Sequence, residues 1–435
     1  MTTENYSHPS DEARRKRVLL LLTAAGDQAE AFRETAEKLG ITLAAGSDRS
    51  DALEEPWRAG AIALDAGDPY GSGQAIVEYA ETHPLDAVIA IEDRLTIPAA
   101  IACETLGIPC HQPYAVLACN DRFEFRSLLE GAGLPVTRFA RLPVDARSPA
   151  LPSEMSYPCV LKPAILLGSR AAVRADNGEQ FAAAFGRIRK LLESPEVQRT
   201  MDDAANWILV EEPLEGPEVT IEGIIDRGRF YMLAIFDRQE MDRQEMDRQK
   251  APNREGTIHV TPSRLAEATQ TVAAKAAALA AHAVGLYHGP VHAEIRLTEK
   301  GPRVLEISPR AVSGPCARTL RFENDWALEE LVLRHALGEG VEAVGREEAA
   351  AGAMTIPAPA DGVLEEVRGE ADARGVAGIE DVCITAKLKE KLVEWPEGAS
   401  CLGYILARGE TPDEVETALR EARRRLEFRV SAAAG

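Results

Sequence analysis

The feature that most constrains how this chain can fold is a pair of alternating segments around residue 300. Residues 291–297 and 303–308 each alternate between apolar and polar side chains, and the four residues between 298 and 303 have the composition of a turn. The pattern predicts a β-hairpin. Because side chains alternate across a strand, Glu294 and Glu306 can converge on one face from neighbouring strands.

Two carboxylates placed so close together point to a cation. Opposed side chains on paired strands lie about 5 Å apart, a distance at which two negative charges repel each other. A hard cation such as Mg²⁺, which prefers oxygen ligands, would remove that repulsion. The alternative is a solvated strand face on which Arg296 and Arg310 neutralise the two acids.

The net charge limits the classes of partner. The chain has 435 residues, and 49 Lys plus Arg against 70 Asp plus Glu give a net charge of -21. This length suits about two to four domains. The excess of acidic residues disfavours nucleic acids and anionic membranes as partners, so a phosphate-binding site must be a local basic pocket.

The cysteines indicate a reducing compartment. Seven cysteines, none in a CxxC pair, lie mostly in apolar segments, which favours reduced thiols in a cytoplasmic protein. Residues 1–16 are polar, lack the apolar region of a signal peptide and are expected to form a flexible tail. No apolar stretch approaches the length of a membrane span.

Alternating strands and helices predict an N-terminal α/β domain. The expected strands are 18–22, 41–45, 60–64 and 87–91, and the expected helices are 28–39, 74–82 and 97–106. The unalternated leucines of the first strand suit a parallel sheet that is buried on both faces. The loop at 23–28 has one glycine and is not GxGxxG, which argues against a nicotinamide-dependent oxidoreductase.

Candidate phosphate ligands follow this domain. A helix after residue 121 can be capped by Asn120 or Asp121. Lys162 ends an apolar strand, where an ammonium group needs an anionic partner. Gly168, Ser169 and Arg170 come next and could offer backbone N–H groups and a guanidinium to a phosphate, although a surface turn explains the same residues.

An acidic linker and a lone histidine are the next candidates. Residues 207–223 predict a strand, a short acidic linker and a second strand; backbone groups there can bind an adenine edge and Glu218 can bind ribose hydroxyls, or the linker is an ordinary acidic turn. His259 could face a substrate or be a polar edge histidine. The sequence Asp-Arg-Gln-Glu-Met, which repeats from residue 237, predicts a solvated loop or a frayed helix.

The last quarter of the chain changes character. Residues 311–321 predict a polar loop, and 328–337 an amphipathic helix. Short β-like pieces at 352–356, 382–386 and 403–407 and a charged final helix at 411–426 then predict a separate α+β module, in which we find no chemistry.

Taken in order, these signals resemble the ATP-grasp superfamily, and within it the carboxylate-amine ligases of biotin-carboxylase-like architecture such as the L-amino acid ligases. The resemblance covers about residues 17 to 430 and is most specific in 157–220 and 286–325. It implies an α/β and α+β fold with a flexible tail (1–16), a Rossmann-like pre-ATP-grasp domain (17–112), an ATP-grasp domain (113–345) with a mobile lid at about 130–205, and a small C-terminal α+β subdomain (346–435).

The resemblance also implies a set of site residues. It assigns ATP to Arg122, Lys162, Gly168, Ser169, Arg170, Glu211, Glu212, Leu214 and Glu218, and Mg²⁺ or Mn²⁺ to Glu294, Glu306 and Ser308. Arg310, together with Lys162, would stabilise the transferred phosphoryl group. Arg318 and His259 would bind a substrate carboxylate and amine.

The implied reaction is the ATP-dependent joining of a small carboxylate and an amine through an acyl-phosphate, with release of ADP and phosphate. Arg122 stands where the family has Lys, Ser308 where it usually has Asn, and the lid loop has fewer small residues. An ATP-binding pseudoenzyme or regulatory module is therefore one alternative. A bicarbonate-activating enzyme, biotin-carboxylase-like or carbamoyl-phosphate-like, is another. Similar enzymes are commonly homodimers.

Overall fold

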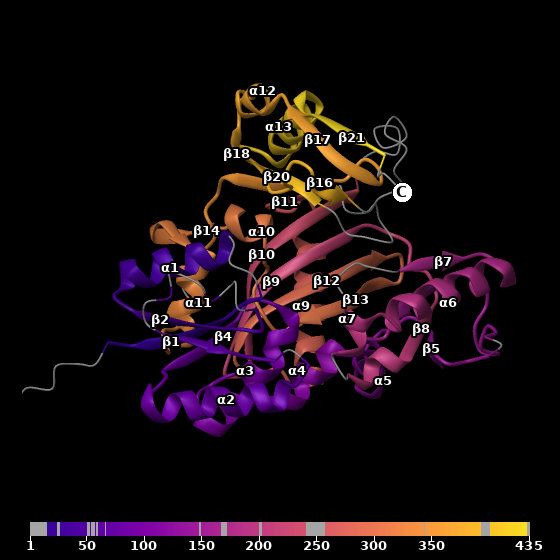
Figure 1. The fold of residues 1–435 in the computed structure, drawn as a ribbon, viewed down its shortest axis with the longest axis horizontal. Helices are drawn as coiled ribbons and strands as arrows, with labels where there is room; N and C mark the ends of the chain where they lie inside the picture. Colours follow the sequence, from indigo (N-terminus) through magenta and orange to yellow (C-terminus); the bar gives the residue numbers. More distant parts are fainter. Residues whose placement is uncertain are drawn as a thin grey trace, which may run out of the picture.

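The structure is a computed structural model, and it describes residues 15–432 except 24–26, 50–52, 54–56, 58–59, 66, 148, 167–171, 200–201, 241–256, 343 and 393–400. Figure 1 shows an N-terminal α/β part, a smaller projecting sheet, and a long central sheet that continues into the C-terminal part.

The N-terminal part is a parallel sheet with helices on both faces. The described residues give the strand order β3-β2-β1-β4. The strands are β1 Arg17–Leu21, β2 Thr42–Ser47, β3 Ala61–Ala63 and β4 Ala87–Ala90, and the helices are α1 Asp27–Leu39, α2 Pro69–Thr82 and α3 Asp93–Leu106. Leu20 packs with Phe32 of α1 on one face, and Leu19 packs with Ile76 of α2 on the other. This burial on both faces explains the continuous run of leucines.

Two short helices lead to a smaller antiparallel sheet. They are α4 Pro113–Asn120 and α5 Arg122–Gly131, and the Asp121 carboxylate caps α5 by accepting from the N–H groups of Phe123 and Glu124. The sheet that follows has the order β5-β8-β6-β7 among the described residues. Its elements are β5 Phe139–Pro143, β6 Cys159–Pro163, β7 Val173–Ala175, α6 Gly178–Leu192, α7 Pro195–Gln198, the 3-10 helix η2 Asp203–Asn206 and β8 Trp207–Glu211.

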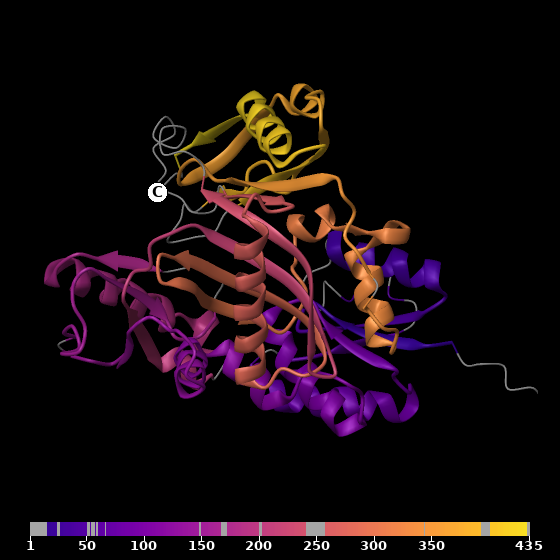
Figure 2. The same ribbon diagram turned by 180° about the vertical axis from the view of Figure 1, so that it is seen from behind.

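The central sheet is antiparallel and has the order β13-β12-β9-β10-β11-β16-β20-β18 in the part of the chain that is described. Its first strands are β9 Glu218–Asp226, β10 Arg229–Glu240, β11 Thr257–Thr261, β12 Gly289–Thr298 and β13 Gly301–Ser308. Helix α9, Glu267–Val284, lies across these strands, as Figure 2 shows from behind. The β12–β13 hairpin confirms the alternation seen in the sequence.

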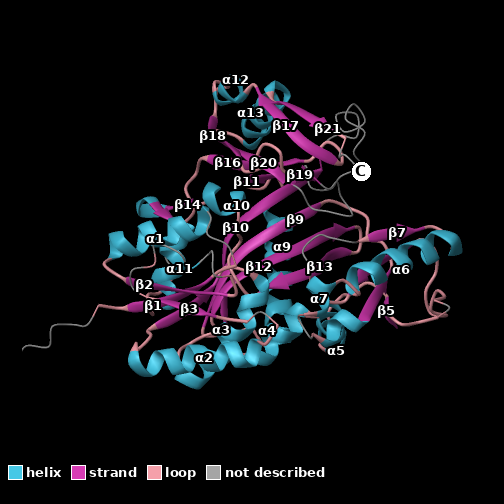
Figure 3. Cartoon of the chain, in the orientation of Figure 1, coloured by secondary structure: helices cyan, strands magenta, loops and turns pink. Residues whose placement is uncertain are grey.

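The C-terminal strands extend this same sheet, so the expected separate module is only partly correct. Strand β16 (Ala350–Pro357) pairs with β11, and β20 (Cys401–Gly409) and β18 (Ile379–Ile384) follow (Figure 3). Strands β17 Gly362–Arg368, β19 Lys391–Leu392 and β21 Glu427–Ser431 form a small second layer with α12 Glu370–Arg374 and α13 Pro412–Arg425.

Two further expectations need correction. The first four residues of the repeat, 237–240, are not a loop but the end of β10, where they pair with β11; the rest of the repeat lies outside the described residues. The loop at 311–321 contains helix α10, Pro315–Thr319, before β14 Arg321–Phe322, η3 Glu323–Asp325, β15 Trp326–Ala327 and α11 Leu328–Ala336. Within the described residues, no helix has both the length and the apolar character needed to cross a bilayer.

Candidate active site

The centre of the site is a pair of carboxylates on the hairpin. Glu294 of β12 is directly opposite Glu306 of β13 in the strand register, as the alternation predicted. Burial and the negative charge of Glu306 raise the pKa of the Glu294 carboxyl. The Arg238 guanidinium lies 3.7 Å from Glu294 and lowers that pKa only in part.

This pair fits a divalent cation. Two partly buried carboxylates offer hard oxygen atoms, and one of them is in an environment that disfavours its negative charge. Ser308 lies two residue pairs along the hairpin, opposite His292, and so on the same face as Glu306. The residues that the sequence assigned to Mg²⁺ therefore share one place, and their coordination of an ion stays a prediction.

Arg122 connects this pair to the phosphate-binding candidates. As the first residue of α5, it directs its guanidinium to Glu306, with Nη2 3.0 Å from Oε2. The same guanidinium donates to the carbonyl oxygens of Pro163 and Ile165, at 3.2 and 2.9 Å. The Arg122 guanidinium thus connects Glu306, a candidate metal ligand, to the backbone directly after Lys162.

Lys162 has the anionic partner that its place in a strand required. Its Nζ lies 2.7 Å from Oε2 of Glu211, whose Oε1 accepts from Nε of Arg126 at 2.8 Å. Burial alone would raise the pKa of the Glu211 carboxyl, but the charges of Arg126 and Lys162 outweigh it and lower the pKa to about 2. The Glu211 side chain therefore positions two cations, and its assignment to ATP by the resemblance stays a prediction.

The acidic linker between β8 and β9 has its own ion pairs. Glu212 is partly exposed and lies 3.4 Å from Arg138, and Leu214 is half-buried. The Glu218 carboxylate binds Arg238 and Arg296, so the residue expected at a ribose is held by two cations in this structure. Gly168, Ser169 and Arg170, the proposed lid loop, lie outside the described residues.

Arg310 is bound to the N-terminal part. Its Nε and Nη2 donate to Oδ1 and Oδ2 of Asp93, at 2.8 and 2.7 Å. Burial would raise the pKa of Asp93, but Arg310 and a hydrogen bond from Ser308 lower it. This two-point contact fixes the plane of the guanidinium that the resemblance assigned to the transferred phosphoryl group, an assignment that stays a prediction.

A pocket of about 380 Å³ opens beside the carboxylate pair. Its lining includes His259, His292, Glu294, Arg238 and Arg310. Burial lowers the pKa of His259 to about 3, helped by the charges of Arg238 and His292. His259 therefore faces the pocket as a neutral imidazole.

His292 and Arg318 differ in how they relate to that pocket. The Nδ1 of His292 binds the Glu222 carboxylate; burial lowers the pKa of His292, and Glu222 outweighs this and raises it. Arg318 donates to the Tyr404 hydroxyl at 2.5 Å and lies 3.2 Å from Asp381, both in the C-terminal part. Its assignment to a substrate carboxylate stays a prediction.

Sequence reasoning missed Arg126, Asp93, Glu222 and Arg238. Two signals were available for the first two. Arg126 follows Arg122 by one helical turn on α5 and shares its face. Asp93 begins α3 just after β4, at the carboxyl end of a parallel strand, where α/β folds place their sites. Arg238 is part of the Asp-Arg-Gln-Glu-Met repeat, whose pattern predicts a solvated loop or frayed helix.

Three sequence families match successive parts of the chain. The ATP-grasp N-terminal domain matches residues 33–110, the ATP-grasp domain residues 155–319, and the L-amino acid ligase C-terminal domain 2 residues 354–431. Together with the geometry above, these matches show that the chain belongs to the ATP-grasp superfamily. Its C-terminal part, residues 354–431, is similar to the second C-terminal domain of L-amino acid ligases.

Curated relatives are distant and longer. Uncharacterized protein y4rH of Sinorhizobium fredii is 23% identical over 76% of this chain and 65% of its own length. The alanine–anticapsin ligase of Bacillus subtilis is 27% identical over 54% of this chain and 51% of its own length. The chain thus spans about half to two thirds of the length of these relatives.

Solved structures confirm the predicted fold class. The L-amino acid ligase from Bacillus licheniformis has a TM-score of 0.79 at 22% identity, with 96% of this chain and 99% of that chain covered. The phosphoribosylglycinamide synthetase from Anaerococcus prevotii has a TM-score of 0.66 at 16% identity, with 96% and 100% covered. These likenesses show a shared ATP-grasp fold.

Proposed function

We propose that this protein is an ATP-dependent carboxylate-amine ligase that joins two small substrates, at least one of them an amino acid, and releases ADP and phosphate. The observation that carries the proposal is the opposed Glu294–Glu306 pair, connected through Arg122 to the loop after Lys162. In the same proposal, residues 17–112, 113–345 and 346–435 are the three domains, and the region at about 130–205 is the lid.

The proposed mechanism has two steps. An oxygen of the substrate carboxylate attacks the γ-phosphorus of ATP, the bond to the β-phosphate oxygen breaks, and ADP leaves. The amine nitrogen then attacks the acyl carbon of the acyl-phosphate, phosphate leaves, and the nitrogen loses a proton. Most of the catalysis comes from positioning and from charges already in place.

The residues around the nucleotide would act as fixed charges. Lys162 and Arg122 would bind the phosphates, and the Glu211 contact keeps the Lys162 ammonium directed. A divalent cation held by Glu294, Glu306 and Ser308 would offset phosphate charge. Arg310, fixed by Asp93, would stabilise the negative charge of the phosphoryl group during transfer.

The 380 Å³ pocket is the proposed place for the acceptor substrate. Arg238 and Arg310 provide positive charge for a carboxylate, and the neutral His259 ring can accept a hydrogen bond from an amine. His292, whose Nδ1 binds the Glu222 carboxylate, lines the same pocket and can take up the proton that the amine releases.

The test is ADP release by the full chain with Mg²⁺, ATP and pooled amino acids. We expect amino-acid-dependent ADP formation, and we expect Glu294→Gln or Glu306→Gln to reduce it by about 10²–10³-fold, as for loss of one preorganised charge. Glu299→Gln, on an exposed position of the hairpin turn, is the matched control and should keep full activity.

Two results would contradict the proposal. One is Mg²⁺-dependent ATP binding by the wild type without ADP release for any amino acid pair, which would indicate a pseudoenzyme. The other is ADP release that requires bicarbonate and not an amino acid, which would indicate a bicarbonate-activating enzyme.

A further inference from the structure

A cluster of two histidines and one aspartate lies away from the proposed active site. Asp226 is the last residue of β9, His288 immediately precedes β12, and His335 is in the last turn of α11. Because β9 and β12 are antiparallel with Gly289 opposite Ile225, the next pair along is His288 opposite Asp226. The sheet register and helix α11 together bring these three side chains to one point.

The geometry fits a tetrahedral metal site. The Oδ1 atom of Asp226 lies 3.2 Å from Nδ1 of His288 and 3.5 Å from Nε2 of His335, and one ligand atom from each residue lies within 4.8 Å of the others. Bonds of about 2.0–2.2 Å to a tetrahedral ion place its ligand atoms about 3.3–3.6 Å apart. The two rings stack with centroids 4.2 Å apart, so both sit beside the same carboxylate.

Both histidines have nitrogen atoms that need a partner. Among the described residues, Nδ1 of His288 and Nε2 of His335 are buried and have no well-aligned hydrogen bond, and the nearby carboxylate of Asp226 is shared by both rings; the residues are 4% and 1% exposed. Leaving a buried polar atom without a partner destabilises the folded state. A bound ion would satisfy both nitrogens at once.

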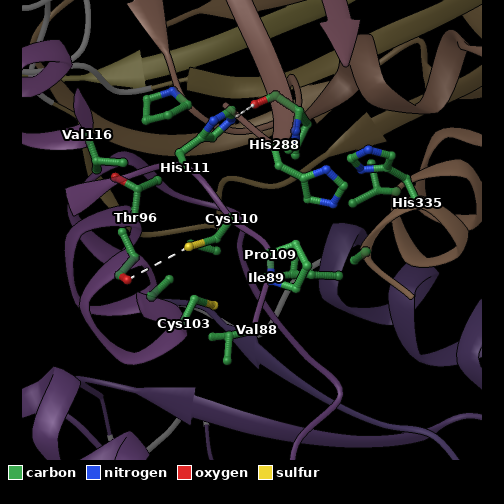
Figure 4. A pocket seen from close by; sticks show the side chains of 18 residues that line it. Val88, Ile89, Thr96, Cys103, Pro109, Cys110, His111, Val116, His288 and His335 are labelled. Atoms are coloured by element: carbon green, nitrogen blue, oxygen red, sulfur yellow. Dashed lines mark hydrogen bonds between the residues drawn. The ribbon is translucent and has the colours of Figure 1, made fainter. Parts of the chain in front are cut away.

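A small cavity adjoins the cluster and offers room for a further ligand. It has a volume of about 70 Å³ and is lined by both histidines and His111 (Figure 4). A water molecule needs only about 10–15 Å³ of such space. His111 is not itself a candidate ligand, because its Nδ1 accepts from the Tyr287 N–H at 3.2 Å and its Nε2 lies 3.1 Å from the Pro290 carbonyl oxygen.

We propose that Asp226, His288 and His335 bind a divalent transition-metal ion, with Zn²⁺ the best fit, and that a water molecule in the adjoining cavity completes its coordination. Two imidazoles and one carboxylate suit Zn²⁺, whereas Mg²⁺ prefers oxygen ligands alone. The ion would tie α11 to the ends of β9 and β12.

The surroundings support this assignment. The two buried imidazole rings and the partly buried carboxylate lie within one cluster that joins the ends of two strands to a helix. The adjacent Arg227 opposes a cation, and the Asp226 carboxylate offsets that charge. Asp226 is six residues beyond Thr220 on β9, the residue opposite Glu294, which is about 20 Å along the strand, so the cluster is distinct from the Glu294–Glu306 pair.

The experiment is a Zn²⁺ titration of the full chain after its metals have been removed with a chelator. Excess Mg²⁺ is present throughout, and binding is measured by calorimetry and by competition with a coloured chelator. We expect one tightly bound Zn²⁺ per chain, and an increase of melting temperature with Zn²⁺. His335→Gln and Asp226→Asn should each weaken binding by at least about 100-fold, since loss of even an indirect partner costs 10–100-fold.

Two controls make the result specific. His282→Gln changes an exposed histidine on α9 and should leave Zn²⁺ binding unchanged. His292→Gln, in the proposed active site, should also leave it unchanged. Should a ligand variant fold poorly, Co²⁺ bound to the wild type provides a second test, because a four-coordinate site with nitrogen ligands gives strong visible absorption.

The proposal is overturned if the wild type binds no Zn²⁺, if Co²⁺ gives no such absorption, or if His292→Gln abolishes binding while His335→Gln does not. None of these outcomes bears on ADP release, so a failure here is distinguishable from a failure of the proposed ligase activity.

Discussion

At the scale of single residues, Glu211 is a carboxylate whose burial is compensated by two cations. It is 2% exposed and lies between Arg126 and Lys162. A buried ion pair adds little when complete, but removing one partner leaves charges without compensation. Glu211 therefore matters for stability as well as for the direction of the Lys162 ammonium.

We expect Glu211→Gln to lower the free energy of unfolding by about 3–5 kcal/mol at neutral pH, because the buried Arg126 loses its counter-ion. Urea denaturation measures the change. Glu212→Gln, which alters the neighbouring and more exposed ion pair with Arg138, is the matched control and should stay within about 0.5 kcal/mol of the wild type.

The same carboxylate gives a pH dependence with a defined sign. Its pKa is about 2 in the folded chain against 4.5 as the ordinary value, so its contribution is complete above pH 4.5 and is lost as the pH falls towards 2. The contribution is on the order of 3 kcal/mol. The free energy of unfolding of the wild type should therefore fall more steeply between pH 4.5 and 2 than that of Glu211→Gln. Equal slopes for the two proteins would contradict this assignment.

At the scale of elements, helix α11 carries two adjacent buried acids in opposite electrostatic environments. Burial raises the pKa of Glu329 to about 7. Burial also acts on Glu330, but Lys38 and Arg334 outweigh it and lower its pKa. Consecutive residues of a helix point in different directions because the helix has 3.6 residues per turn, so Glu329 and Glu330 contact different parts of the protein.

Glu329→Gln should stabilise the protein at alkaline pH. Because its folded-state pKa is raised above 4.5, Glu329 favours folding at low pH, and this contribution is lost as the pH rises through about 7. At about pH 8 the variant should be more stable than the wild type by about 1–3 kcal/mol, and near pH 4 the difference should vanish. Thermal unfolding across this pH range measures it.

Glu330→Gln is the control for that experiment and should have the opposite sign. It removes the partner of Lys38 and Arg334, so it should destabilise the protein at about pH 8. If both variants shift the melting temperature in the same direction, the two environments have been wrongly assigned.

At the scale of the whole molecule, one sheet joins the proposed catalytic strands to the C-terminal part. Strand β16 forms backbone hydrogen bonds with β11, and Ile258 and Val260 of β11 are buried in the C-terminal hydrophobic core. The C-terminal residues therefore cover an edge that would otherwise be open to other chains.

We expect a chain that ends at residue 345 to aggregate, because β11 then exposes unpaired N–H and C=O groups beside apolar side chains. Size-exclusion chromatography and light scattering measure this. Co-expression with residues 346–435 as a separate chain should restore a soluble complex. A monomeric 1–345 fragment with cooperative unfolding would show that the shared sheet is dispensable.

The hairpin could be predicted from sequence because its information is local. Alternation over 291–308 and a short turn predict the two strands and their antiparallel pairing. The helices and strands of the N-terminal part were predicted for the same reason. The exact partner of Glu294 was not determined in this way, because a register shift between Glu294 and Ile295 is what places Glu306, and not Leu305, opposite it. The lysine at 162 required an acid, and the structure provides Glu211.

What sequence could not provide was the identity of distant partners. Nothing near Arg310 indicates Asp93, which is 217 residues earlier in the chain. The pairing of β11 with β16 was missed because alternation defines a strand but not its neighbour. The Asp226, His288 and His335 cluster depends on three elements that meet only in the folded chain.

The Asp93–Arg310 contact has a consequence for building hybrid enzymes. Exchanging the N-terminal domain for that of a relative with a neutral residue at this position would remove the partner of Arg310, although no catalytic strand had been altered. A chimera that transplants the acid along with its helix would keep the guanidinium in place. A hybrid of this protein must therefore contain both Asp93 and Arg310 if the guanidinium is to keep its partner.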